Sequence, residues 1–366
     1  MSRRELTQIR PYEPGKPIEE VKKEYGLTDI VKLASNENPL GPSPKAASAI
    51  SKALSELHLY PDGGSVDLKN ALAERFNVEP NWITVGNGSD EIIKRLAETF
   101  LTPADSIVVA KPTFSEYKFA AQLMGAEIVE IPCQKGRLDL PLMAAAVSEN
   151  TKLVFVCNPN NPTGTIVSKA EVERFLSEVP QDVLVVFDEA YAEYVDSEDY
   201  LSAVNYLKEY PNVVVLRTFS KIYGLASLRI GYALADPEVI SLVEKAREPF
   251  NVNRLAQIGA LAALADTEHV ERSRRVNQEG KKQLAAGFAK LGWRPLDSQT
   301  NFMLVETFQD CRRLFQDLLK KGIIIRPADI FGLPTSIRVT VGTEEQNAAF
   351  LAAVQEIMAA KEGEAV

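Results

Sequence analysis

Short apolar runs alternate with longer amphipathic stretches over the first two thirds of the chain. The runs are rich in Val and Ile and lack a strict two-residue alternation, which is typical of strands in a sheet covered on both faces. With helices between the strands, this rhythm predicts an α/β fold with a mostly parallel sheet. The expected strands are residues 82–85, 106–110, 127–131, 152–157, 183–187 and 212–216, and the expected helices include residues 90–100, 115–124 and 169–178.

The pattern changes after about residue 250. A long helical tract at 255–291 leads to a mixture of strands and one further helix. We therefore expect a three-layer large domain over residues 41–250 and a smaller α+β domain over residues 251–366. Residues 1–40 contain much Pro and turn chemistry, and are expected to form an arm that joins the small domain. The strands expected in the small domain are 300–305, 323–327 and 336–341, and its helix is 311–320.

Composition narrows the classes of function. The formal charge of -9 argues against binding to a nucleic-acid backbone. Two histidines and three scattered cysteines fit no zinc site, so we expect no metal, and unpaired thiols suit a reducing compartment. The N-terminal residues lack the apolar core of a signal peptide, and no apolar run reaches membrane-spanning length. We expect a soluble, cytoplasmic protein without a membrane partner.

Residues after the predicted strands are candidates for a site, because ligands in open α/β sheets bind beyond the carboxyl ends of the strands. The segment GNGSDEII follows the first strand, and its Ser89 and Asp90 open a helix whose N-terminus suits a phosphate. An ordinary helix cap would have the same sequence. After the next strand, Phe114 or Tyr117 could stack on a flat ring, although such aromatic residues are more often part of the core.

Two later strand ends carry polar groups. The segment NPNNPTG at 158–164 predicts a rigid turn in which Asn161 offers a side-chain amide. Asp188 ends the strand at 183–187, where a buried carboxylate is costly unless it is paired. A protonated pyridine nitrogen is a suitable partner, and Tyr191 could donate to a phenolic oxygen on the same ring. A plain turn and a helix-capping aspartate remain the alternatives for these two segments.

The last strand of the series leads into VVVLRTFSKIYGLASLRIG at 213–231. Hydroxyls and an arginine can cradle a phosphate while a lysine presents an amine beside it, and pyridoxal phosphate requires both. Taken alone, a solvent-facing lysine after a buried strand is an equally good interpretation. The ordered combination with the earlier strand ends favours the cofactor. The residues concerned are Thr218, Ser220, Lys221 and Arg229.

The motifs NPNNPTG, FDEAY and TFSKIYGLASLRIGY, in this order, resemble the fold-type I pyridoxal-phosphate aminotransferases of the aspartate aminotransferase superfamily. More narrowly, ASNENPLGPSP, YPDGG, GNGSDEII, PFNVNRLAQ, QTNFMLVE and IIIRPADIFGLPTSIRVTVGT make the chain similar to histidinol-phosphate aminotransferases, from about residue 9 to residue 342. Aromatic-amino-acid aminotransferases and threonine-phosphate decarboxylases share much of this pattern and stay open as alternatives. Ser227 stands where the family usually has Gly.

The resemblance implies pyridoxal 5'-phosphate as cofactor. Lys221 would form a Schiff base with it and then act as the base, while Asp188 would pair with the ring nitrogen. Phe114 would lie on the face of the ring. Asn161 and Tyr191 would hold the 3-oxygen of the ring. The residues around the phosphate would be Ser89, Asp90, Thr218, Ser220 and Arg229.

The same resemblance implies a homodimer and a reaction. Tyr60 would reach the cofactor phosphate of the neighbouring subunit. Arg338 would grip the anionic end of the substrate, with Tyr12, Asn36 and Arg326 as further contacts. The reaction would pass the amino group of L-histidinol phosphate to 2-oxoglutarate, giving imidazole acetol phosphate and glutamate in histidine biosynthesis.

Overall fold

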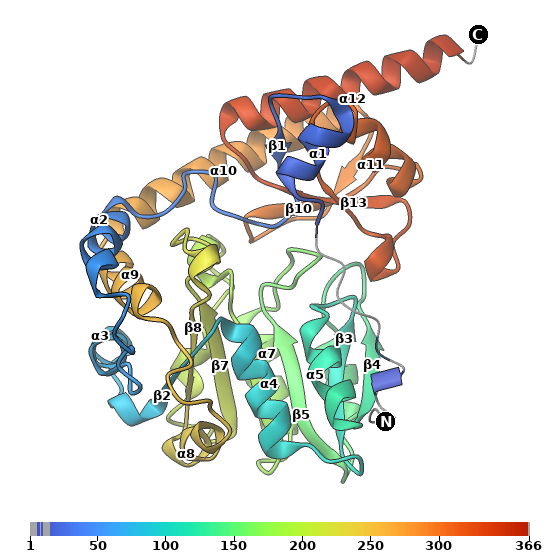
Figure 1. Cartoon of the computed structure of the whole chain (residues 1–366). Coiled ribbons are helices and arrows are strands. Elements are labelled where there is room, and N and C mark those ends of the chain that lie inside the picture. The colour runs from blue at the N-terminus through green and yellow to red at the C-terminus, as the bar shows by residue number, and fades with distance from the viewer. Residues whose placement is uncertain (1–5, 8, 10–14, 365–366) are drawn as a thin grey trace.

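The computed structural model describes residues 6–7, 9 and 15–364, and arranges them as a large lobe with a smaller lobe above it (Figure 1). In the described part of the large lobe, a seven-stranded sheet has the order β2-β8-β7-β6-β5-β3-β4, in which β8 runs antiparallel to both of its neighbours. The prediction of an α/β fold with a mostly parallel sheet is confirmed. The strands are β2 Ile83–Gly86, β3 Ser106–Lys111, β4 Glu127–Pro132, β5 Thr151–Cys157, β6 Leu184–Asp188, β7 Val213–Thr218 and β8 Gly231–Ala235.

Helices cover both faces of this sheet, because successive side chains of a strand point to opposite sides. In β3, Val109 packs in the cluster with α4, α5 and α8, whereas Val108 packs in the cluster with α3, α6, α7 and α9. The three-layer arrangement is therefore confirmed. The helices of the large lobe are α2 Pro44–Ala53, α3 Val66–Phe76, α4 Ser89–Phe100, α5 Glu116–Met124, α6 Leu140–Ala145, α7 Lys169–Glu178, α8 Pro237–Lys245 and α9 Arg254–Leu264.

Two features of the large lobe differ from the pattern expected from the sequence. Strand β8 was not expected, because its run GYALA follows β7 without an intervening long helix and returns antiparallel to it. The helical tract at 255–291 is broken into two helices near Asp266, whose carboxylate accepts a hydrogen bond of 2.6 Å from the Ser43 hydroxyl. This bond ties the break to the start of α2.

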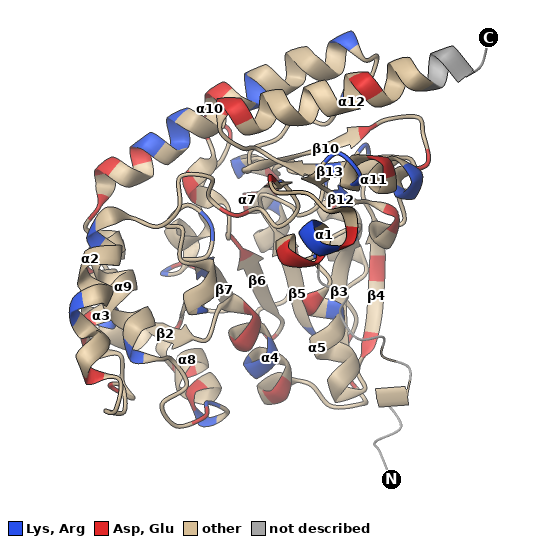
Figure 2. Cartoon of the chain, turned by 45° about the horizontal axis from the view of Figure 1, so that its top comes forward, with Lys and Arg blue, Asp and Glu red and all other residues tan. Residues whose placement is uncertain are grey.

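The small lobe has its own core, which includes Val21 and Leu33 from the N-terminal part of the chain. Within the described residues its main sheet has the order β12-β13-β10-β9, and β1 pairs in parallel with β11. Acidic and basic residues are interspersed along α10 (Figure 2). The elements are α1 Ile18–Tyr25, β1 Val31–Lys32, α10 Thr267–Lys290, β9 Arg294–Pro295, β10 Phe302–Glu306, α11 Cys311–Leu319, β11 Ile323–Ile324, β12 Arg326–Pro327, β13 Ser336–Thr340 and α12 Glu344–Glu364.

The division of the chain at residue 250 stays a prediction. Helix α9 packs against α2 and α3, and its Ala256, Ala260 and Ala263 belong to the core of the large sheet. This packing favours a boundary later than residue 250, near the start of α10. Among the described residues, no helix combines the length and apolar character that crossing a bilayer requires.

The segment that follows β1 joins the two lobes at the loop that carries Lys221. The Asn38 side-chain amide donates to the backbone oxygen of Ile222 at 2.7 Å and to the Ser273 hydroxyl at 2.9 Å. Gly224 lies against the same segment, because a Cβ placed there would be 2.2 Å from the backbone oxygen of Gly41. The Lys221 loop is thus held from outside by the N-terminal segment.

Replacing Gly224 by Ala should destabilise the protein more than replacing Gly292. Both glycines have a φ of 69°, so each substitution costs about 1–2 kcal/mol for the left-handed backbone. Nothing lies within 4 Å of a Cβ at Gly292, whereas Gly224 meets a backbone oxygen. We expect Gly224→Ala to lower the free energy of unfolding in urea by about 2 kcal/mol more than Gly292→Ala. Equal losses in the two variants would contradict the close approach of the two segments.

Candidate active site

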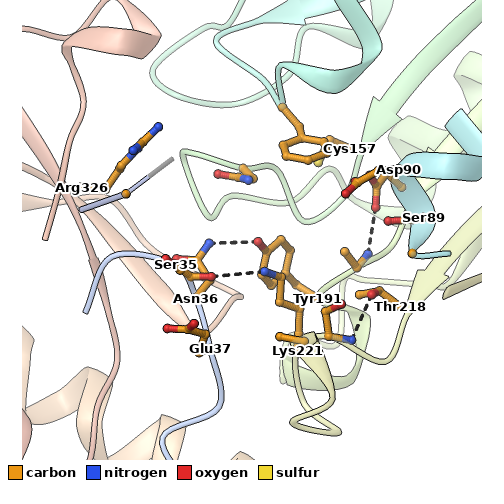
Figure 3. Close-up of a pocket in the computed structure, with 18 of the residues that line it drawn as sticks. Ser35, Asn36, Glu37, Ser89, Asp90, Cys157, Tyr191, Thr218, Lys221 and Arg326 are labelled. Atoms are coloured by element: carbon orange, nitrogen blue, oxygen red, sulfur yellow. Dashed lines mark hydrogen bonds between the residues drawn. The ribbon is translucent and has the colours of Figure 1, made fainter. Parts of the chain in front are cut away.

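A cavity lies at the carboxyl ends of the strands, between the large and small lobes (Figure 3). Its lining brings together residues from both lobes and from the N-terminal segment. Most of the residues expected from the sequence are among them. They are Asn36, Ser89, Asp90, Phe114, Asn161, Asp188, Tyr191, Thr218, Ser220, Lys221, Arg229, Arg326 and Arg338.

Two expected residues are not placed in this cavity. Tyr12 lies outside the described residues. Tyr60 is 80% exposed on the surface of the subunit, where its ring stacks on Phe250 with the centroids 4.8 Å apart. A contact between Tyr60 and a cofactor would therefore require a second subunit.

Asp188 is the last residue of β6 and is buried. Its Oδ2 accepts a hydrogen bond of 2.7 Å from the Tyr117 hydroxyl, and its Oδ1 accepts one of 3.1 Å from the backbone N–H of Ala190. Burial raises the pKa of the carboxyl to about 6, and the Tyr117 bond opposes this rise. The result is a fixed carboxylate that would be stabilised by a cation placed beside it.

Lys221 follows β7 and points into the cavity beside the Tyr191 ring, with Nζ 5.7 Å from the ring centroid. Its amine donates to the backbone oxygen of Ser35 at 3.4 Å. Burial, followed by the charge of Arg338, lowers the pKa of this amine to about 8. The lowered pKa increases the uncharged fraction of the amine near neutral pH, and the uncharged amine is the form that attacks a carbonyl carbon.

A polar network joins the two lobes beside Lys221. The Asn36 side-chain amide donates to the Tyr191 hydroxyl at 3.0 Å, and Nη1 of Arg338 donates to Oδ1 of Asn161 at 2.6 Å. Nη2 of Arg338 donates to the backbone oxygen of Ala34 at 2.9 Å. Burial raises the pKa of Tyr191, so its hydroxyl keeps its proton and can donate it in a hydrogen bond.

One end of the cavity has the groups that bind a phosphate. Helix α4 begins at Ser89, directly after the turn that follows β2, so its N-terminal N–H groups face the cavity. Arg229 lies across this turn and pairs with Asp90 at 3.0 Å. A Cβ at Gly88 would lie 2.8 Å from Nη2 of Arg229, so the glycine leaves room for the guanidinium and for an anion. Thr218 and Ser220 add hydroxyls.

These features fit the pyridoxal phosphate that the resemblance implies. The phosphate end, the amine of Lys221 and the buried carboxylate of Asp188 line one cavity, and the aromatic ring of Phe114 lines it as well. The phosphate end suits a dianion, the amine of Lys221 can react with an aldehyde, and the carboxylate of Asp188 can pair with a protonated ring nitrogen. Within the described residues, no group of three His, Cys, Asp or Glu side chains could hold a metal ion.

The small lobe contributes two arginines to its own side of the cavity. Arg326 in β12 and Arg338 in β13 are direct partners in the antiparallel ladder, and both line the cavity. Like charges directly opposite each other destabilise a sheet. A bound anion would offset this repulsion, and guanidinium groups suit either a phosphate or a carboxylate.

Several lining residues were not expected to take part in the site. Ser35, Glu37 and Cys157 line the cavity. Of the two aromatic residues that the sequence offers for stacking, Phe114 lines the cavity, whereas Tyr117 lies behind it and takes an unexpected role as the hydrogen-bond partner of Asp188. Ser35 and Glu37 flank Asn36, so the register of that segment is the signal that could have found them. The signal for Tyr117 is its place three residues after Phe114, which puts both rings near the same helix start.

Comparison with protein families gives one clear match. A model of the family described as Aminotransferase class I and II matches residues 28–354. The histidinol-phosphate aminotransferase of Moorella thermoacetica is 53% identical over 358 residues, which cover 98% of this chain and 93% of that protein. The histidinol-phosphate aminotransferase of Brevibacillus brevis is 50% identical over 347 residues, which cover 95% of each chain.

A solved structure agrees in fold. The crystal structure of a histidinol-phosphate aminotransferase from Sinorhizobium meliloti in complex with pyridoxal-5'-phosphate superposes with a TM-score of 0.91 at 29% sequence identity. The superposition covers 98% of this chain and 97% of that one. The similarity therefore extends over both lobes.

Replacing Asp188 by Asn should stabilise the cofactor-free protein above pH 6. The native pKa of about 6 lies above that of an unfolded aspartate, so the native state retains a proton that the unfolded state loses between about pH 4 and 6. Stability therefore falls as the pH rises through this window, by up to about 3 kcal/mol. In urea unfolding, we expect Asp188→Asn to be about 1–3 kcal/mol more stable than wild type at pH 8. At pH 4 the two proteins should differ little, and an equal gain at both pH values would contradict the assignment.

Proposed function

The chain belongs to the aminotransferase class I and II family, and we propose that it transfers the amino group of L-histidinol phosphate to 2-oxoglutarate with pyridoxal 5'-phosphate as cofactor. Relatives with about half of their residues identical over nearly the whole chain have the name histidinol-phosphate aminotransferase. The observation that carries the proposal is the position of Lys221, which shares one cavity with a phosphate-binding helix end, a buried carboxylate and two arginines. The reaction would serve histidine biosynthesis.

Pyridoxal phosphate, when bound, supplies an electron sink for the bond that breaks at the amine-bearing carbon. Lys221 would hold it covalently, and Asp188 would pair with its ring nitrogen. Phe114 would lie on the ring face. Asn161 and Tyr191 would donate to the ring oxygen. The phosphate would be bound by the α4 N-terminus and by Ser89, Thr218, Ser220 and Arg229, with Asp90 orienting the arginine.

Lys221 is also the proposed base. With a substrate amine in place, its uncharged Nζ would take the proton from the substrate carbon that carries the nitrogen. A pKa of about 8 suits this role, since the amine can both accept and return a proton near neutral pH. Tyr191 keeps its hydroxyl proton and holds its position through the bond to Asn36.

Arg326 and Arg338 are the proposed anion site for both substrates. Histidinol phosphate has a phosphate but no carboxylate beside its amine, whereas 2-oxoglutarate has two carboxylates. Guanidinium groups can donate two parallel hydrogen bonds to either anion. Asn36, and Tyr12 from the part of the chain outside the described residues, are proposed as further substrate contacts.

We further propose a cytoplasmic homodimer in which Tyr60 contacts the cofactor phosphate of the other subunit. Support comes from the exposed Tyr60–Phe250 stack and from the apolar side chains of Leu54, Leu57 and Leu59, each at least half exposed in the single chain. A second copy is the partner that would cover this surface. The three cysteines are free, which suits a reducing compartment.

The substrate assignment predicts a ranking of amino donors. With 2-oxoglutarate as acceptor, kcat/KM for histidinol phosphate should exceed that for tyrosine or phenylalanine by about tenfold or more, because the phosphate dianion binds the arginine pair more strongly than a carboxylate does. Glutamate formation in a coupled assay measures each rate. A higher kcat/KM for tyrosine or phenylalanine would favour an aromatic-amino-acid aminotransferase. Release of carbon dioxide from threonine phosphate would favour a decarboxylase.

The shared site predicts complementation between two inactive variants. Each site is proposed to combine Lys221 of its own subunit with Tyr60 of the other. Lys221→Ala therefore disables the site of the subunit that has the substitution, whereas Tyr60→Ala disables the site of its partner subunit. A mixed dimer keeps one complete site, so random mixing should recover about a quarter of wild-type activity. Each variant alone, taken through the same unfolding and refolding, is the control. Absence of recovery, with mixed dimers verified by mass spectrometry, would contradict the role of Tyr60.

A further inference from the structure

Tyr117 lies in the first turn of α5 and is completely buried behind the cavity. Its ring stacks on Phe155 of β5, with the centroids 4.6 Å apart and the planes at 10°. It also forms a T-shaped pair with Phe114, with the centroids 5.6 Å apart and the planes at 78°. Tyr117 therefore supports the aromatic ring that lines the cavity and is itself fixed by the central sheet.

The hydroxyl of Tyr117 contacts the carboxylate of Asp188, which lines the same cavity as Phe114. It donates to Oδ2 of Asp188 at 2.7 Å, while the backbone N–H of Ala190 donates to Oδ1. Each carboxylate oxygen can accept a second hydrogen bond, so one direction stays available toward the cavity. Two donors from different elements thus fix the orientation of Asp188.

Other groups around Asp188 make its ionisation costly. Burial contributes most, and the nearby carboxylates of Asp90 and Glu189 act in the same direction, whereas the Tyr117 and Ala190 bonds oppose them. Burial holds the pKa of Tyr117 well above its ordinary value and raises that of Cys157 to about 12, so both keep their protons. Tyr191 also keeps its proton. Tyr117 therefore provides the side-chain hydrogen bond that stabilises the carboxylate form.

We propose that Tyr117 is a positioning residue that keeps Asp188 oriented and ionised for the ring nitrogen of the cofactor. The cofactor part of this inference rests on the proposed function. The rest is a property of the chain alone, since the Tyr117–Asp188 contact needs no ligand. A tyrosine serving the core alone would contribute to stability without affecting the carboxylate.

Tyr117→Phe isolates the hydroxyl, because the substituted ring can keep its packing on Phe155 and Phe114. Tyr232→Phe is the matched control, since Tyr232 is equally buried and its hydroxyl has no hydrogen-bond partner among the described residues. Pyridoxamine 5'-phosphate is the probe, because it lacks the aldehyde and cannot form a Schiff base with Lys221. Its binding therefore reports on contacts to the ring and the phosphate.

Two measurements test the proposal. In cofactor-free protein, we expect the pKa of the Asp188 carboxyl, followed by its ¹³C chemical shift, to rise by about one unit in Tyr117→Phe. In equilibrium dialysis at pH 5.5, we expect the Kd of pyridoxamine phosphate to rise about fivefold or more in this variant, because a one-unit rise from a carboxyl pKa of about 6 lowers the ionised fraction of Asp188 about eightfold at this pH. Tyr232→Phe should match wild type in both measurements.

The outcomes separate this inference from the proposed function. If wild type does not bind pyridoxamine phosphate, the proposed function fails, while the carboxyl pKa still tests the Tyr117 contact. If wild type binds and Tyr117→Phe binds within about twofold of it, the positioning role is wrong. An unchanged carboxyl pKa in Tyr117→Phe would overturn the proposal in the same way.

Discussion

Burial of an acid and an amine at the ends of two neighbouring strands is the constraint on which this structure depends. Strands β6 and β7 are adjacent and parallel, and they deliver Asp188 and Lys221 to the same edge of the sheet. Loss of water moves the two pKa values toward neutrality, to about 6 and about 8. A site that needs a buried carboxylate and an uncharged amine therefore starts with a cost to folding, which the two apolar layers on the sheet must offset.

A second cluster of buried charges, formed by Arg217, Glu189 and Glu193, fixes these strand ends. Arg217 precedes Thr218 in β7 and forms ion pairs with Glu189 at 2.6 Å and with Glu193 at 3.0 Å. Glu189 directly follows Asp188, so the pair joins β7 to the segment that carries both Asp188 and Tyr191. Removal of one partner from such a buried pair is strongly destabilising. The cluster therefore ties the geometry of the site to the stability of the fold.

The sequence was sufficient for the part of the site that is built from strand ends. Buried apolar runs locate the strands, and parallel pairing brings Asn161, Asp188 and Lys221 together without further information. The contacts that depend on tertiary packing could not be derived in this way. In the sequence, Tyr117 cannot be told from an ordinary core residue, and only the structure shows its hydroxyl bound to Asp188. Strand β8 was missed because no long helix separates it from β7. Tyr60 stays on the surface of one subunit, so a single chain cannot test its role.

The anion site shows why the substrate is harder to read from sequence than the cofactor. Arg326 and Arg338 become direct neighbours because β12 and β13 pair across a turn, and each alone reads as an ordinary surface arginine. Both then line the same cavity as Lys221, because the small lobe is joined to the large one through Asn36 and the segment around it. Specificity thus depends on how two lobes meet, whereas the cofactor site is fixed within one sheet. Variation in the contact between the lobes can change the substrate while the groups around Lys221 stay the same.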